Sequence, residues 1–176
     1  RSKSGIFQTQ QVEDIIRAKQ REIEKTLQDI INSPDEFIAD PMPNLYFTRD
    51  NFACVFDGVS LNHMYSNTRN REMIYGEYIF RYHPDYRDFF QYYHRDFPWH
   101  IEGGDLIVLN SHVVIVGISE RTEKNAILEL ARQFFSHDDC TIDTILVFAI
   151  PSKRAFMHLD TVFTQVDRNK FVYQKN

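Results

Sequence analysis

Cysteine, basic charge and long apolar runs are all limited in this 176-residue chain. The two cysteines, Cys54 and Cys140, are far apart and have neither a CxxC spacing nor a histidine at metal-ligand spacing. They indicate no metal site, and we expect two buried thiols in a reduced, cytoplasmic protein. The longest apolar runs, such as residues 145–150, are much shorter than the roughly 20 residues that a membrane-spanning helix requires.

Twenty Lys and Arg stand against 25 Asp and Glu, which gives a net charge of −5 with neutral histidines. Nucleic acids and acidic membranes bind clustered basic side chains, so neither partner is expected. A small or cationic ligand agrees better with this charge. The hydrophobic content of 43% and the charged content of 26% are ordinary for a soluble globular protein.

The first 40 residues are predicted to hold one amphipathic helix, at about residues 8–32. Its apolar positions fall at helical spacing, at Val12, Ile15, Ile16, Ile23, Leu27, Ile30 and Ile31. Pro34 ends it, because a proline disfavours helix at the preceding residue. The chain begins with Arg1 and has no apolar signal core, so we expect it to be part of a longer polypeptide.

Residues 41–176 alternate between strand-like and helix-like patterns. We expect strands at residues 45–47, 53–56, 59–64, 106–109, 113–118 and 145–150, and helices at residues 67–81 and 123–135. The run at 145–150 is continuously apolar, which is typical of a strand covered on both faces. The order from residue 106 to residue 150 is one strand-strand-helix-strand (ββαβ) unit, and the flanking segments resemble parts of neighbouring units.

Aromatic side chains are abundant, with 15 Phe and 9 Tyr, and they crowd residues 82–100. Aromatic rings could stack on bases, but the three arginines in and beside this stretch are too few to follow a phosphate backbone. We therefore expect a loop that packs its rings on the core or against a second chain.

Acidic residues and a histidine interrupt three strand-prone segments. PNLYFTRD (43–50) ends in opposite charges without a turn residue, while IEGGD (101–105) and MHLDT (157–161) each precede an apolar run. A semi-buried carboxylate is tolerated only where it meets a cation or several donors. We therefore expect three strands to deliver Asp50, Glu102, His158 and Asp160, with a cation or several donors beside the carboxylates.

These segments, together with GISERT (117–122), resemble the arginine deiminases of the guanidine-modifying superfamily in the family's order. The resemblance covers about residues 41–171. It implies a partial α/β-propeller of ββαβ units (the pentein fold) at 41–176, preceded over residues 1–40 by the end of an inserted helical bundle. The family's nucleophilic cysteine lies near the C-terminus of a longer chain, and no residue here corresponds to it.

The resemblance implies hydrolysis of L-arginine to citrulline and ammonia, without metal or organic cofactor. Asp50 and Asp160 would bind the substrate's guanidinium, whose planar fork of N–H donors suits carboxylates. His158, assisted by Glu102, would transfer protons. Four further residues would line the pocket, the two arginines receiving the substrate's α-carboxylate: Asn44, Phe47, Arg69 and Arg121.

Several alternatives stay open at this stage. Each motif alone has a structural explanation, such as a surface ion pair between Arg49 and Asp50 or a simple bend at Gly103-Gly104. Cys54 would face the same side as Asp50 on an extended strand, which makes it a conceivable substitute nucleophile. His63, His83, His94, His100, His112 and His137 match no family motif.

The functional alternatives differ in whether the chain is part of an active enzyme and in which substrate that enzyme uses. A fragment would be inactive without the missing cysteine and would need a complementing C-terminal fragment or self-association to cover its apolar faces. Alternatively, the chain is a truncated, non-catalytic remnant that binds arginine or a protein partner. Agmatine deiminase and amidinotransferase are further possibilities, but the arginine pair at 69 and 121 favours a substrate with a carboxylate.

Overall fold

The computed structural model describes residues 31–32, 41–151, 153 and 155–175. The helix expected at residues 8–32 and the boundary expected at residue 40 therefore fall almost entirely outside the described residues. Residues 31 and 32 themselves are helical and exposed. No helix within the described ranges is long and apolar enough to cross a membrane.

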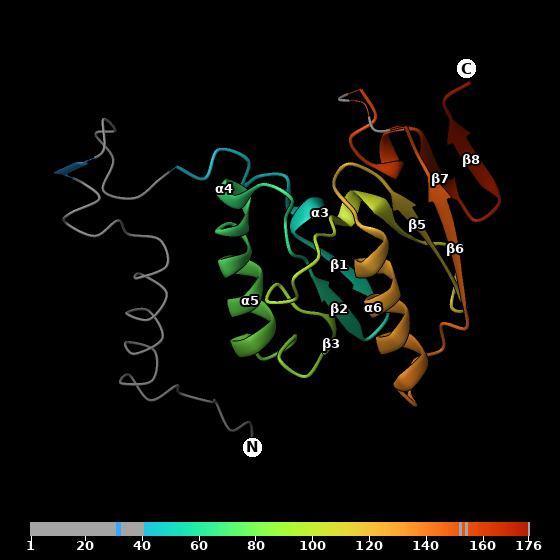
Figure 1. The fold of residues 1–176 in the computed structure, drawn as a ribbon. Coiled ribbons are helices and arrows are strands. Elements are labelled where there is room, and N and C mark those ends of the chain that lie inside the picture. Colours follow the sequence, from blue (N-terminus) through green and yellow to red (C-terminus); the bar gives the residue numbers. More distant parts are fainter. Residues whose placement is uncertain (1–30, 33–40, 152, 154, 176) are drawn as a thin grey trace.

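The described part of the chain forms three small sheets that follow one another in sequence (Figure 1). The first contains β1 (Phe52–Val55), β2 (Gly58–Leu61) and β3 (Phe90–Tyr93), in that order. The second contains β4 (Leu106–Val108), β5 (Val113–Ile118) and β6 (Thr144–Ala149) in the same arrangement. The third is a hairpin of β7 (Phe163–Asp167) and β8 (Lys170–Tyr173).

The first two sheets repeat one ββαβ unit. In each, the first two strands are antiparallel and the third is parallel to the second. A parallel pair needs a long crossover, and α5 (Met73–Tyr82) and α6 (Lys124–Ser136) supply it. The short α4 (Asn67–Asn70) precedes α5, so the single helix expected at residues 67–81 is two helices. The unit predicted from residue 106 onward is confirmed, with element ends within two residues of those expected.

The main core lies between the first two sheets and α6. Tyr92 and Tyr93 of β3 are fully buried there, and the Tyr92 ring meets Phe134 of α6 edge-on at 4.7 Å. The prediction of a loop at residues 82–100 is therefore wrong in part, because four of these residues form β3. Its packing on the core is confirmed.

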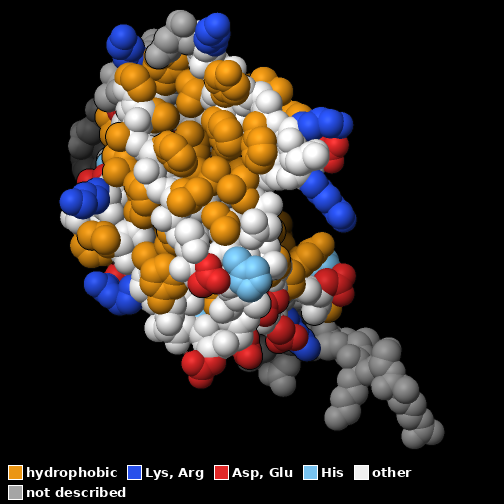
Figure 2. Space-filling model, turned by 90° about the vertical axis from the view of Figure 1, so that its right-hand side faces the viewer, with side chains coloured by type: hydrophobic (Ala, Val, Ile, Leu, Met, Phe, Trp, Pro, Cys, Tyr) orange, Lys and Arg blue, Asp and Glu red, His pale blue; other side chains and the backbone are white. Residues whose placement is uncertain are grey.

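Two strand expectations are corrected. Residues 45–47 form a turn, in which the N–H of Phe47 donates to the Asn44 carbonyl at 2.9 Å. Strand β6 is apolar but not covered on both faces, since Leu146, Val147 and Phe148 are 41–50% exposed. It is the edge strand of its sheet, and Figure 2 shows apolar side chains gathered on this face of the molecule.

A single helical turn stands before the first strand of every sheet. These turns are α3 (Thr48–Asn51), η1 (Gly103–Asp105) and η2 (Leu159–Thr161). The candidate acids were expected on strand ends, and this detail is wrong: Asp50 and Asp160 lie in such turns, while Glu102 and His158 immediately precede them. A helical turn points neighbouring side chains in different directions, so Arg49 and Asp50 contact different partners.

Candidate active site

Three chain segments bring their polar side chains to one place at the centre of the molecule. His158 Nε2 lies 2.6 Å from Glu102 Oε2, and His158 Nδ1 lies 3.6 Å from Asp50 Oδ1. Glu102 is fully buried and His158 nearly so. The structure thus places a histidine between two carboxylates that are 52 residues apart in sequence (102 − 50).

Gly103 and Gly104 allow these segments to approach closely. A Cβ on Gly103 would collide with the Arg49 carbonyl oxygen, and a Cβ on Gly104 would lie 2.7 Å from the His158 ring. Atoms at such separations overlap, so side chains at these positions would push η1 away from α3 and from His158. The glycine pair is therefore required for assembly of the site and is more than a bend.

Electrostatics favour the charged form of His158. Burial acts to lower the pKa of His158, but the hydrogen bond and charge of Glu102, with the charges of Asp50 and Asp105, raise it above the ordinary value. Both ring nitrogens face carboxylates, and an imidazolium carries a donor on each nitrogen. The arrangement therefore holds a proton ready for donation.

Asp105, for which the sequence predicted no role, links the segments of the site through its hydrogen bonds. Its Oδ2 accepts hydrogen bonds from the hydroxyls of Ser119 and Thr122, each at 2.6 Å. Its Oδ1 accepts the backbone N–H of Leu159 at 2.8 Å, beside His158. Burial raises the pKa of Asp105, and these three donors oppose that effect. The residue stands in the quoted IEGGD motif, and its two hydroxyl donors stand in GISERT.

Asp160 faces a different cation. Its Oδ2 lies 3.1 Å from Nε of Arg49, and its side chain is 23% exposed. Burial raises the pKa of Asp160, the charges of His158 and Arg49 act to lower it, and nearby Asp50 raises it. Asp50 and Asp160 are therefore both electrostatic neighbours of His158. That the two acids bind one flat cation stays a prediction.

Arg69 is buried and holds Asp50 in place. Its Nη1 donates to Asp50 Oδ2 at 2.8 Å, and its Nε donates to Glu72 Oε2 at 3.0 Å. Its Nη2 donates to the backbone carbonyls of Asn44 and Phe47, at 3.4 and 3.5 Å. All three guanidinium nitrogens thus have protein acceptors, and Asn44 and Phe47 meet Arg69 through their main chain.

Arg121 has fewer protein partners than Arg69. Its Nη1 lies 3.7 Å from Glu102 Oε1, and its guanidinium carbon lies 5.1 Å from the centre of the Tyr65 ring. Its Nε is buried without a hydrogen-bond partner among the described residues, while 22% of the side chain is exposed. Stacking on Tyr65 orients this guanidinium and leaves donors for a further acceptor.

Cys54 does not lie on one strand face with Asp50, the arrangement that the sequence suggested for an extended strand. Asp50 lies in α3, so the alternation along one strand that would align the two residues does not apply. Cys54 is exposed, against the expectation of a buried thiol, and Cys140 is intermediate. Desolvation raises the pKa of Cys54, which disfavours the thiolate that a nucleophile requires.

Asp50, Glu102 and His158 offer ligand atoms within 4.8 Å of one another. A metal ion binds the neutral imidazole, so it would have to displace the proton that these two carboxylates stabilise. Proton transfer is therefore the chemistry that this donor set supports best.

The fold belongs to the pentein class of α/β proteins. A dimethylarginine dimethylaminohydrolase bound to S-methyl-L-thiocitrulline has a TM-score of 0.59 to this chain at 19% identity, and the match covers 93% of this chain and 57% of that one. The N-terminal domain of a cyanobacterial arginine dihydrolase has a TM-score of 0.59 at 16% identity, covering 93% of this chain and 54% of that domain.

Sequence similarity then identifies the family: residues 3–176 match the arginine deiminases, and the chain belongs to that family. The arginine deiminase of Clostridium perfringens is 50% identical over 149 residues, which cover 84% of this chain and 36% of that protein. The arginine deiminase of Treponema denticola is 54% identical over 135 residues, covering 76% and 33%. The chain thus spans about a third of the length of these curated relatives.

Proposed function

We propose that this chain carries the guanidinium-binding and proton-transfer residues of an arginine deiminase, which converts L-arginine and water to citrulline and ammonia. The observation that supports this most strongly is the His158 imidazole between Glu102 at 2.6 Å and Asp50 at 3.6 Å. Three separate chain segments build this arrangement, and residues 3–176 match the arginine deiminase family.

Asp50 and Asp160 are proposed to bind the guanidinium. A planar cation with five N–H donors is held best by carboxylates at its edges. Arg69 occupies one oxygen of Asp50 and Arg49 one oxygen of Asp160, so each carboxylate keeps acceptor capacity for a ligand. No cofactor or metal enters this proposal.

His158 is proposed to manage the protons. As an imidazolium it donates a proton to the nitrogen that leaves as ammonia, and as a neutral base it then removes a proton from the attacking water. Glu102 stabilises the charged ring. A cysteine from outside these 176 residues is proposed to attack the guanidinium carbon and to be released by that water.

Arg121 is proposed to receive the substrate's α-carboxylate, because its buried Nε lacks a protein acceptor among the described residues. Arg69, expected from the sequence to receive the α-carboxylate as well, has another role. Its three nitrogens already donate to the protein, so we propose that it orients Asp50 rather than binding the carboxylate itself. Asn44 and Phe47 would then shape the pocket by wrapping Arg69.

A complementing segment is proposed to complete the fold. The β7–β8 hairpin corresponds to the first two strands of a ββαβ unit and has no helix or third strand among the described residues. Beside it a groove of about 320 Å³ is lined mainly by apolar side chains, including Phe148, Phe156 and Phe163. We propose that a C-terminal segment, such as the longer relatives contain, covers this face and completes an α/β-propeller. We propose the cytoplasm as the location of this protein.

Complementation tests this function. The chain is mixed with the C-terminal remainder of the Clostridium perfringens arginine deiminase, and citrulline is measured after addition of arginine. We expect citrulline from the mixture, none from either part alone, and none when His158→Gln replaces the native chain. A complex that forms on size exclusion yet yields no citrulline would contradict the proposal.

The non-catalytic alternative predicts a different result in the same system. Calorimetric titration of the chain with arginine would show binding that Asp50→Ala abolishes, while every complemented mixture stays without turnover. Desolvation raises the pKa of the Cys54 thiol, which makes it a poor nucleophile, and this favours the non-catalytic alternative for the chain by itself.

A further inference from the structure

Arg49 stands in the site without an assigned role. Its Nε lies 3.1 Å from Asp160 Oδ2, yet 59% of its side chain is exposed. Its guanidinium is the same chemical group that the proposed substrate presents to Asp160. We propose that Arg49 is an internal, displaceable guanidinium, which occupies Asp160 in the absence of ligand and competes with the ligand for that carboxylate. This inference rests on the proposed function.

The contrast with Arg69 supports displacement. Arg69 is buried, and its three nitrogens donate to acceptors from several segments, so it is fixed. Arg49 has one carboxylate partner among the described residues and a largely exposed side chain. Exposed ion pairs are worth little because solvent competes for both charges. Arg49 can therefore leave Asp160 at small cost, whereas Arg69 cannot leave Asp50.

The backbone and the side chain of Arg49 also behave differently. The Arg49 carbonyl packs against Gly103, where a Cβ would collide with it, and this contact fixes α3 beside η1. The side chain points to η2 and can rotate outward without moving α3. Displacement therefore leaves the position of the neighbouring Asp50 unchanged.

The charges around Asp160 explain why a cation sits there at all. Asp50 is close enough to raise the pKa of Asp160, and two neighbouring carboxylates repel one another unless a cation stands between them. His158 and Arg49 provide that positive charge. An incoming guanidinium carries the same charge and the same kind of N–H donors, so it can replace Arg49 in this role.

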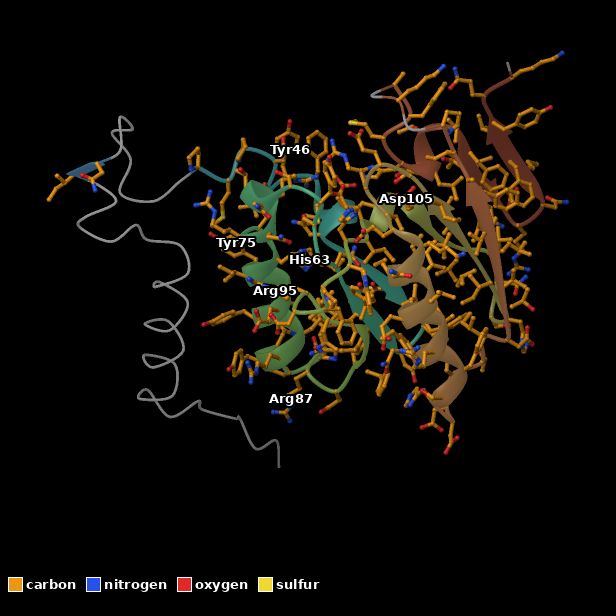
Figure 3. All side chains as sticks on the ribbon, in the orientation of Figure 1. Tyr46, His63, Tyr75, Arg87, Arg95 and Asp105 are labelled. Atoms are coloured by element: carbon orange, nitrogen blue, oxygen red, sulfur yellow. The ribbon has the colours of Figure 1, made fainter. Side chains whose placement is uncertain are left out.

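Calorimetric titration with L-arginine tests the inference on three variants of the 176-residue chain. Arg49→Gln removes the competing charge and should tighten arginine binding by about two- to fivefold, the range that one exposed ion pair supports. Arg49→Lys keeps a competing cation and should bind like the native chain. Arg87→Gln is the charge-matched control, because Arg87 is half-exposed and lies far from Asp105 in Figure 3.

The outcomes separate the two proposals. Unchanged or weaker binding by Arg49→Gln, with the native chain binding arginine, would overturn the Arg49 inference and leave the proposed function standing. Binding by Arg49→Gln but not by the native chain would support both proposals. Absence of binding by the native chain and by both Arg49 variants, all folded by circular dichroism, would overturn the guanidinium site and the inference with it.

Discussion

The centre and the outer face of this molecule reverse the usual distribution of polarity. Around η1 the structure buries Glu102, Asp105, His158 and Arg69. On the face formed by β6 and β8 it exposes large apolar side chains, such as Phe148 at 50% and Val172 at 59% (Figure 2). The first region is charged and buried, and the second is apolar and exposed among the residues that the structure describes.

The two regions differ in whether other groups of the described chain compensate the charges or cover the apolar surface. Every buried charge at the centre meets an opposite charge or several hydrogen-bond donors, so its desolvation is compensated within the described chain. The outer face lacks such compensation, because apolar surface gains free energy only when another surface covers it. Apart from the Nε of Arg121, the charges at the centre are therefore balanced within the described residues, whereas the outer face keeps its apolar side chains exposed.

The largest effect on this comparison should come from Glu102→Ala. It leaves the buried His158 without its closest carboxylate, and loss of one partner of a buried ion pair costs about 3–5 kcal/mol of unfolding free energy. Urea denaturation followed by circular dichroism measures the loss. Asp138→Ala, at an exposed acid, is the control and should change little. Equal stability of the two variants would contradict a centre held by paired charges.

Asp105→Ala should have a smaller but clear effect. It leaves the buried N–H of Leu159 without its acceptor, which costs about 1–3 kcal/mol, whereas the hydroxyls of Ser119 and Thr122 can rotate to other acceptors. Thermal denaturation measures the effect. Asp105→Asn keeps the shape and an acceptor oxygen, so it should lose less. If both variants were as stable as the native chain, Asp105 would not link the three segments.

The regular elements could be predicted from sequence because local patterns encode them. Helix α6 follows from apolar residues at helical spacing, and β5 from a run of β-branched residues. Strand β3 was missed because its four residues stand in a longer aromatic-rich stretch that has no clear period and no turn signals beside the strand. The single turn α3 was missed because four residues are too few to show a period.

The sequence predicted which residues lie at the centre, but not which partners they contact. The motifs around Asp50, Glu102 and His158 identify the acids and the histidine. The acceptors of Arg69 belong to five residues between 44 and 72, and the partners of Asp105 lie up to 54 residues away. Contacts of this kind depend on the tertiary fold, and no local pattern in one sequence encodes them.

The pH dependence of stability should report the paired charges directly. The folded-state pKa of His158 is raised above its usual 6.5, so its contribution is fully present below pH 6.5 and is lost as pH rises through the folded-state pKa. The unfolding free energy should then fall by at most about 1.4 kcal/mol per pH unit above pH 6.5.

Stability measured from pH 6 to pH 9 on His158→Gln should lack this decline. His94→Gln, at an exposed histidine, should keep it. The raised pKa values of Asp105 and Asp160 act in the same direction but begin at lower pH, from 3.8. A decline that is the same in both histidine variants would assign it to other groups.

The outer face should respond in the opposite way, with the smallest change in stability. Phe148→Ser removes an aromatic ring that is half-exposed and lines the groove, so the unfolding free energy should change by no more than about 0.5 kcal/mol. Association should change instead: on size exclusion the variant should bind the complementing C-terminal fragment, or a second copy, more weakly than the native chain does. Phe135→Ser is the matched control, since Phe135 of α6 is 59% exposed and does not line the groove. If the two variants associated equally well, the groove beside β7 and β8 would not be the docking face.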